Sequence, residues 1–178
     1  WKTDGTETGT VMIKDINPGS QESMSDLYHP SFAAIGSTVF FSASDGSNGH
    51  ELWKTDGTES GTVMVKDIRS GSLSCDPYSF FEYDSEVFFW ANPGTGDELW
   101  KSDGTESGTE LLTDMPSIDS SCQWMHRDCI VEAGSNMFFM VSDLTIMTYD
   151  GTNAPTTISS GLDNVMHEAG LVALGNYV

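Results

Sequence analysis

Aspartate followed by glycine recurs in this sequence and provides its first candidates for chemistry. The four pairs are Asp4-Gly5, Asp56-Gly57, Asp103-Gly104 and Asp150-Gly151. Carboxylates in glycine-containing loops can bind calcium, which prefers oxygen ligands. The same dipeptide forms an Asx turn, in which the carboxylate accepts a backbone N–H. Because no DxDxDG string of the EF-hand type accompanies these pairs, we favour the turn.

Two other loops carry weaker calcium candidates. One is the segment 45–49 with Asp45, and the other is the segment 92–97 with Asp97. Their glycines indicate flexibility and do not by themselves specify a set of ligands. The sequence therefore predicts no cofactor and no defined metal site, and calcium is the one ion that these loops leave open.

The candidate catalytic groups do not form a recognisable pattern. Glu51 and Glu98 occupy equivalent positions in different repeat units, which gives little support for a glycosidase acid/base pair. The four histidines share no spacing typical of a metal site or a catalytic triad. The sequence also lacks the GxSxG, HExxH, P-loop and dinucleotide-binding motifs. We therefore predict that the protein is not an enzyme.

The charge balance narrows the choice of partners. Acidic side chains number 27 and basic side chains 7, which gives a formal net charge of −20. Nucleic acids and anionic membrane surfaces both require clustered Lys and Arg, so neither is an expected partner. No apolar run is long enough to cross a membrane. The acidic excess predicts a hydrated surface that resists non-specific association, with a surface adapted to divalent cations as the alternative.

Basic and aromatic residues recur at fixed places. Five of the seven basic residues do so, namely Lys2, Lys54, Lys101, Lys14 and Lys66. We expect each to pair with an acidic group of an adjacent strand or unit, because opposite charges across strands stabilise modestly. The tryptophans that recur are Trp1, Trp53 and Trp100. They could stack on sugars, but aromatic residues fixed by a repeat more often pack between units.

The three cysteines leave two disulfide pairings open. Cys122 and Cys129 flank a short segment and could close a small loop, whereas Cys75 precedes Cys122 by 47 residues, one full repeat period. Either pairing leaves one thiol over, free or joined to another chain. Three reduced, buried thiols are the third alternative. Because no CxxC pair is present, we expect no zinc site.

Most of these residues belong to one repeated motif. It reads WKTDGTETGT at 1–10, WKTDGTESGT at 53–62, WKSDGTESGT at 100–109 and, in a divergent form, MTYDGTNAPT at 147–156. Successive copies start 52, 47 and 47 residues apart. A fixed period of this length is typical of repeat architectures. We therefore expect the recurring Trp, Asp and Gly residues to build the repeat rather than to perform chemistry.

Each repeat unit predicts four short antiparallel strands joined by hairpins. In the best-preserved copy the strands are expected at 32–35, 39–44, 51–55 and 62–68, with Asp-Gly as a hairpin turn. The next two units give 80–83, 87–91, 98–102 and 109–115, then 129–133, 137–142, 145–149 and 156–159. The second strand of each unit is bulky and apolar on both faces, so neighbours must cover both. This predicts an all-β fold, either a β-propeller or a propeller-like array of four-stranded blades of about 47 residues.

The repeat also divides the chain. We expect one repeat domain over 1–178, made of a partial blade at 1–16, blades at 17–68, 69–115 and 116–160, and a second partial blade at 161–178. The first partial blade supplies the last two strands of a unit and the second supplies the first strands. The simplest explanation is an excerpt from a longer tandem array.

The strings ELWKTDGTESGT and ELWKSDGTESGT resemble the ELWxxDGT repeat family. The resemblance implies a large secreted or surface protein, mostly of bacteria and some protists, built of propeller-like β-repeats. It implies an extracellular location and a scaffold or adhesion role, and no defined catalytic residues. The last copy departs from the pattern, because Met147, Tyr149 and Pro155 replace Trp, Thr or Ser, and Gly. That unit is expected to end the array or to face a different neighbour.

Two functions follow as hypotheses. The first is a non-enzymatic structural protein that self-associates, with neighbouring units of the same chain or with other copies, through open strand edges. The second is a module that binds carbohydrate or protein on the loops 17–29, 70–77 and 116–128, which share one face of the repeat. Aromatic and apolar residues in or beside these loops are the candidates for recognition: Tyr28, Tyr78, Trp124 and Met125.

Overall fold

The computed structural model describes residues 1–19, 22–24, 32–112, 130–141 and 145–159. These residues form three four-stranded antiparallel sheets and no helix. Sheet A contains β1 (Ala33–Ile35), β2 (Thr38–Ser44), β3 (His50–Thr55) and β4 (Val63–Lys66). Sheet B contains β5 (Tyr78–Tyr83), β6 (Glu86–Ala91), β7 (Glu98–Ser102) and β8 (Glu110–Leu111). Sheet C contains β9 (Ile130–Ala133), β10 (Asn136–Val141), β11 (Thr145–Tyr149) and β12 (Thr156–Ser159).

Within each sheet the strands follow one another by hairpins in chain order. The all-β prediction and the four-stranded antiparallel unit are therefore confirmed. The strand expected at 62–68 is shorter than predicted, since β4 covers only Val63–Lys66, whereas β12 covers Thr156–Ser159 as predicted. In the part of the chain that is described, no helix is long and apolar enough to span a membrane.

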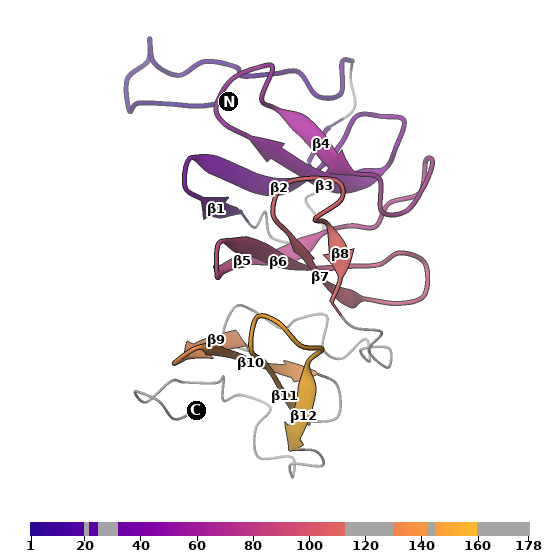
Figure 1. Cartoon of the computed structure of the whole chain (residues 1–178). Coiled ribbons are helices and arrows are strands. Elements are labelled where there is room, and N and C mark those ends of the chain that lie inside the picture. Colours follow the sequence, from indigo (N-terminus) through magenta and orange to yellow (C-terminus); the bar gives the residue numbers. More distant parts are fainter. Residues whose placement is uncertain (20–21, 25–31, 113–129, 142–144, 160–178) are drawn as a thin grey trace, which may run out of the picture.

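The sheets are stacked face to face, with residues 1–16 lying beyond sheet A (Figure 1). These residues, here called the N-terminal ribbon, double back on themselves, and Lys2 and Val11 exchange two backbone hydrogen bonds of 2.9 Å. The described parts form an open, curved stack, and they do not close into a ring.

Sheets A and B approach each other most closely along their first strands. Their backbones are closest at β1, β2, β5 and β6. Ala33 of β1, Phe80 of β5 and Trp100 of β7 are all buried in the core between them. The first strands β1, β5 and β9 thus lie along the inner side of the curve (Figure 1).

Sheet B has an apolar core on each of its two faces. Phe88 and Phe89 are neighbours on β6, so they point to opposite faces, and both are fully buried. Phe89 joins Phe40 and Leu52 of sheet A in one core, while Phe88 joins Met137 and Phe139 of sheet C in another. A third, smaller core lies on the far face of sheet A. The apolar double face seen in the sequence is thus explained by neighbours on both sides.

We expect Phe88→Ala and Phe89→Ala to destabilise the protein by similar amounts, about 3–5 kcal/mol each, because each removes a ring from a closed core. Urea unfolding followed by tryptophan fluorescence measures this loss. Leu111→Ala, at an exposed position on β8, is the control and should change stability by about 0.5 kcal/mol or less. A small effect of either phenylalanine variant would show that one face of sheet B is not packed as described.

Candidate functional site

The motif loop is held by its own side chains. In the copy at 55–62, the Asp56 carboxylate accepts hydrogen bonds from the Thr58 backbone N–H (2.9 Å) and the Thr58 hydroxyl (2.6 Å). The bond from the Thr58 hydroxyl contributes most to lowering the pKa of Asp56, followed by the backbone bond. Gly57 adopts a positive φ of 85° and donates its N–H to the Thr55 hydroxyl. The aspartate therefore works as the acceptor of an Asx turn.

The later half of the loop closes in the same way. The Thr58 hydroxyl accepts the Gly61 N–H at 3.0 Å, and the Thr62 hydroxyl donates to the Thr58 carbonyl at 2.7 Å. A Cβ atom at Gly61 would overlap the Asp56 carboxylate, which explains glycine at this second position. Loops 3–10 and 102–109 repeat these bonds around Asp4 and Asp103. Most positions of the string DGTxxGT thus have a partner inside the loop.

The fourth copy keeps the aspartate and its two bonds from the following threonine, Thr152, and adds Asn153 as a second partner. Asp150 accepts hydrogen bonds from the backbone N–H groups of Asn153 and Thr152, at 2.8 and 2.9 Å, and from the Asn153 amide. The backbone bond from Asn153 is the main cause of the lowered pKa of Asp150. Pro155 takes the place of the second glycine. The sequence change in this copy therefore accompanies a different hydrogen-bond pattern.

Two further loops carry the weak calcium candidates of the sequence, Asp45 and Asp97. Asp45 accepts bonds from the Ser47 and Asn48 backbones and from the Asn48 amide, all within 2.9 Å. Asp97 lies close enough to Asp76 for its charge to contribute to the raised pKa of Asp76, which burial mainly causes. No group of three or more His, Cys, Asp or Glu residues is placed to hold a metal ion in the described ranges.

Lysines of one unit reach the motif loop of the next. Lys2 of the ribbon donates to the Gly57 carbonyl at 2.9 Å, and Lys14 donates to the Thr62 carbonyl at 2.7 Å. Both acceptors lie in the loop that joins β3 to β4. We call such a pair of bonds a lysine clamp. Because the donor is charged, each bond is stronger than one between neutral groups.

A second clamp joins sheets A and B. Lys54 donates to the Gly104 carbonyl and Lys66 to the Thr109 carbonyl, both at 2.7 Å. The sequence predicts that these four lysines pair with acidic groups of an adjacent strand or unit, but their hydrogen bonds go to backbone carbonyls instead. The loop leaves these carbonyls available because its internal bonds use mostly side-chain oxygens. Lys2 and Lys54 still lie near an acidic group of the next unit, because their charges contribute, after the threonine hydrogen bonds, to the lowered pKa of Asp56 and of Asp103.

The interface between sheets B and C is built differently. Lys101 lies at the position of Lys54, but it pairs within sheet B with Glu86, at 3.1 Å. Burial lowers the pKa of Lys101, but the hydrogen bond and charge of Glu86 outweigh this effect, so the pKa is raised overall. Instead of a clamp, the Tyr83 hydroxyl donates to the Ser135 carbonyl at 2.6 Å. Here the contact between sheets rests on the aromatic core, on this bond and on the interaction of Lys101 with Tyr149 of sheet C.

The motif tryptophans pack toward the preceding unit. Trp53 packs in one core with Ile16 of the ribbon. Trp100 packs in another core with Ile68, which belongs to the preceding unit. The Lys14 ammonium lies 5.9 Å from the centre of the Trp53 ring system, a cation–π distance. By contrast, Trp1 is 78% exposed. Trp53 and Trp100 therefore serve packing, and their rings are not available to stack on sugar.

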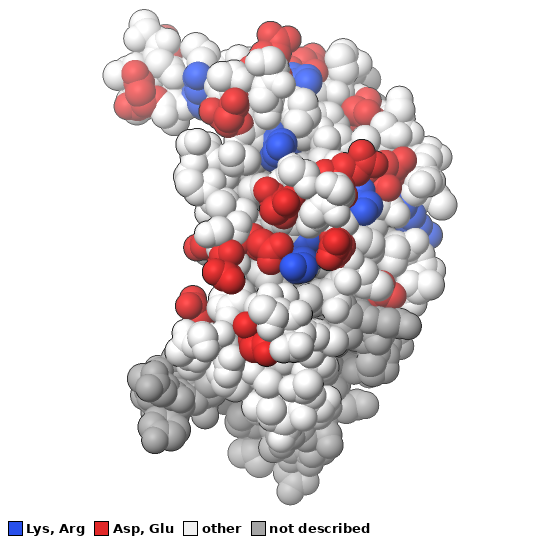
Figure 2. Space-filling view, viewed as in Figure 1, with Lys and Arg blue, Asp and Glu red and all other residues white. Residues whose placement is uncertain are grey.

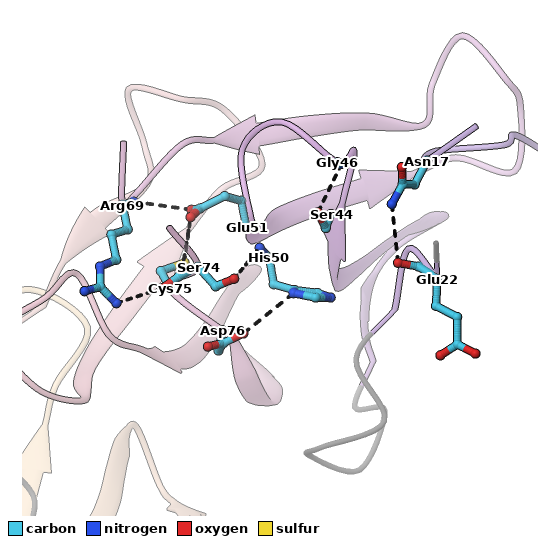
Figure 3. A network of polar contacts seen from close by, with 10 residues as sticks. All are labelled: Asn17, Glu22, Ser44, Gly46, His50, Glu51, Arg69, Ser74, Cys75 and Asp76. Atoms are coloured by element: carbon cyan, nitrogen blue, oxygen red, sulfur yellow. Dashed lines mark hydrogen bonds and ion pairs between the residues drawn. The ribbon is translucent and has the colours of Figure 1, made fainter. Parts of the chain in front are cut away.

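A buried polar network lies where the chain passes from sheet A to sheet B (Figure 3). The Glu51 carboxylate accepts bonds from the backbone N–H of Ile68 (2.7 Å) and from the N–H and thiol of Cys75 (3.2 and 3.0 Å). Burial raises the pKa of Glu51, and these hydrogen bonds oppose the shift. Beside it, His50 lies 3.8 Å from Asp76. The network ties the segment that connects the two sheets to the first two residues of β3.

The same network corrects the prediction for Cys75. Its thiol is free and buried, so the Cys75–Cys122 disulfide is wrong. Burial and the nearby Glu51 charge raise the thiol pKa, which keeps the sulfur protonated and unreactive. Cys122 and Cys129 lie outside the described residues. Glu51, which the sequence offered only as a weak catalytic candidate, is instead the acceptor that Cys75 and the connecting chain require.

A groove on the inner side of the curve was not predicted. It has a volume of about 390 Å³ and is lined by Phe32, Ala33, Ala34, Phe81, Glu82, Tyr83, Ile130, Glu132 and Met137. Apart from Met137 of β10, these residues come from the first strand of each sheet or directly precede it. Alignment of the first strands could have found it, since Ala34, Glu82 and Glu132 occupy the same position in successive units. The predicted binding residues fall elsewhere: Tyr78 is half-buried beside the core between sheets B and C, and Tyr28, Trp124 and Met125 lie outside the described residues.

Comparisons with known proteins leave the function open. No family model matches the chain, and no curated protein is significantly similar to it. Among solved structures, a crystal structure of the computationally designed protein Ika8 resembles 72% of this chain, at 17% sequence identity and a TM-score of 0.38. The chain spans 34% of the length of that protein. A likeness of this degree carries no argument about function.

We expect the Cys75 thiol to resist a thiol-specific reagent in the native protein and to react fully in denaturant, because burial keeps it protonated and covered. The measurement compares the thiols titrated by Ellman's reagent in each condition after reduction. Cys75→Ser removes this thiol and serves as the control for assignment. Rapid native modification that disappears in Cys75→Ser would contradict the buried network.

Proposed function

We propose that the protein is a non-enzymatic scaffold, made of β-units that each fasten to the next, and that it acts outside the cell. One observation carries the proposal: the recurring Lys, Asp, Gly and Thr residues are engaged in hydrogen bonds inside the motif loop or across the lysine clamps. A residue engaged in this way builds the repeat and is not offered to a substrate. The resemblance to the ELWxxDGT repeats supports the extracellular location.

We also propose that each sheet is a blade of a propeller-like array of about 47 residues per unit. The curvature around the first strands supports this, since blades of a propeller converge on their inner strands. The clamps support it as well, because the same two bonds join the ribbon to sheet A and sheet A to sheet B. An array of this kind is stabilised by contacts between neighbours.

The lysine clamp can be tested directly. We expect the double variant Lys54→Met/Lys66→Met to lose about 2 kcal/mol in free energy of unfolding, because two charge-assisted bonds between sheets A and B are removed. Lys101→Met is the comparison: it removes the ion pair with Glu86 and the contact with Tyr149 but no lysine clamp, and it should cost about 0.5–1 kcal/mol. Urea unfolding provides both values. If the double variant cost no more than Lys101→Met, the clamps would not hold the units together.

Exposed apolar side chains of the ribbon support contact with another repeat unit. Trp1 is 78% exposed and Met12 is 55% exposed, and these residues correspond to Trp53 and Met64, which pack on the preceding unit. Because Trp53 and Met64 are covered by a preceding unit, we propose that another repeat unit, of the same chain or of a second copy, covers Trp1 and Met12. The contact would reproduce the packing of Trp53 against Ile16.

Sedimentation velocity over a range of protein concentrations tests this contact. We expect association that increases with concentration and is abolished in Trp1→Ser/Met12→Ser, because the exposed apolar face is lost. Leu73→Ser/Ile158→Ser removes two other exposed apolar side chains and should associate like the unaltered protein. A monomer at every concentration, or equal loss in both double variants, would exclude this face as a contact between copies.

A binding module remains the second candidate function, because the inner groove offers a specific site. Its lining combines aromatic rings with two carboxylates. Carbohydrate or protein binding on the connecting loops stays a prediction.

A further inference from the structure

The groove on the inner side of the stack has the size of a small-ligand site. Its volume of about 390 Å³ falls within the range of roughly 300–1,000 Å³ that such sites occupy. The space-filling view shows the molecule hollowed on this side, with acidic side chains along the rim (Figure 2). Three successive sheets contribute to the lining, so the groove exists only where units are stacked.

The lining combines aromatic rings and negative charge. Phe32, Phe81 and Tyr83 supply rings, and Phe32 is 44% exposed, so part of its surface is open to a ligand. Glu82 and Glu132 supply two exposed carboxylates. No Lys, Arg or His is among the described residues that line the groove. The charge is therefore not neutralised from within the groove.

The aromatic wall is held in place by the core behind it. Phe81 stacks on Phe88 with ring centres 5.3 Å apart, and Tyr83 meets Phe88 edge-on at 5.8 Å. The Tyr83 hydroxyl is tied to the Ser135 carbonyl of sheet C. Burial raises the pKa of Tyr83, and the charge of Glu132 adds to the shift, so Glu132 lies near this ring. Rings fixed in this way lose little entropy when a ligand binds.

We propose that the groove binds a small organic cation, an ammonium group carried on an apolar body. An ammonium is attracted to the faces of aromatic rings, and neighbouring carboxylates strengthen that attraction. The apolar body would lie against Ala33, Ile130 and Met137. The net charge of −20 raises the local concentration of cations and disfavours anions. The inference does not depend on the scaffold proposal, since a groove between units can bind whether or not the array assembles further.

Isothermal titration calorimetry with three matched probes tests the charge preference. At neutral pH and low salt, phenethylammonium is a cation, 2-phenylethanol is its neutral analogue and phenylacetate is an anion. We expect phenethylammonium to bind about tenfold more tightly than 2-phenylethanol, and phenylacetate to give no measurable binding. Added salt should weaken the binding of the cation.

Variants locate the site. Glu82→Gln/Glu132→Gln should weaken phenethylammonium binding about tenfold, because both carboxylates leave the groove. Glu59→Gln/Glu106→Gln removes the same charge from two exposed positions outside the groove and should change affinity by about twofold or less. Phe32→Leu keeps an apolar side chain but removes a ring, and we expect a loss of about threefold. Far-ultraviolet circular dichroism and the thermal midpoint establish that each variant is folded.

Three results would overturn the proposal. The first is equal binding of the cation and the neutral alcohol, which would leave the carboxylates without a role. The second is an equal loss in the two glutamine double variants, which would indicate general attraction to an acidic protein. The third is the absence of binding by any probe to the folded protein. None of these results bears on the lysine clamps or on the ribbon contact, so the scaffold proposal is judged separately.

Discussion

Sheets that are apolar on both faces cannot remain alone in water, and this constraint determines the rest of the structure. On β6, Phe88 and Phe89 point in opposite directions and both are fully buried, so sheet B requires a neighbour on each side. Stacking satisfies the requirement and creates two closed cores. The polar features then act on a stack that burial of apolar surface has already made favourable. Lysine clamps and the Glu51 network fix how the sheets sit, while the cores supply most of the driving force.

The motif illustrates how a sequence repeat becomes a structural part. Asp56 and Thr58 fold the loop onto itself, and Gly61 leaves the space that the Asp56 carboxylate occupies. The folded loop then presents the carbonyls of Gly57 and Thr62 to lysines of the preceding unit. Local hydrogen bonds thus prepare a contact between units. This order, from turn to loop to interface, gives a structural reason for the recurrence of the string.

Much of the fold could be predicted from the sequence, since period, turn residues and apolar runs are local signals. The strand 87–91 follows from its run of β-forming apolar residues between the Asp84-Ser85 turn and the glycine-containing loop 92–97. The acceptors of Lys54 and Lys66 could not be predicted, because backbone carbonyls carry no mark in the sequence. Cys75 was misread for a related reason. Its spacing of 47 residues from Cys122 reflects equivalent places in two units, and equivalent places are separated by the stacking distance and need not touch.

The inner groove escaped prediction because it belongs to no single unit. Ala34, Glu82 and Glu132 share one position in the repeat, where the first unit has alanine and the next two have glutamate, and only the curvature of the stack brings their strands to a common hollow. Residues that recur in every unit therefore build the stack of sheets. We infer that positions that vary between units determine what the groove can bind. Glu82 and Glu132 are of the second kind.

The lysine clamps have a consequence for how such a chain can change over generations. Each clamp takes its donor from a side chain and its acceptor from the main chain, as with Lys54 and the Gly104 carbonyl. A substitution in the loop that accepts the bond leaves the backbone carbonyl in place as long as the loop keeps its shape. The sequence of the loop can therefore change without a matching change of the lysine. Duplicated units can then diverge one at a time and still join their neighbours. Loss of the donor is what breaks a junction, and at Lys101 the side chain has turned to Glu86 beside the most divergent copy of the motif.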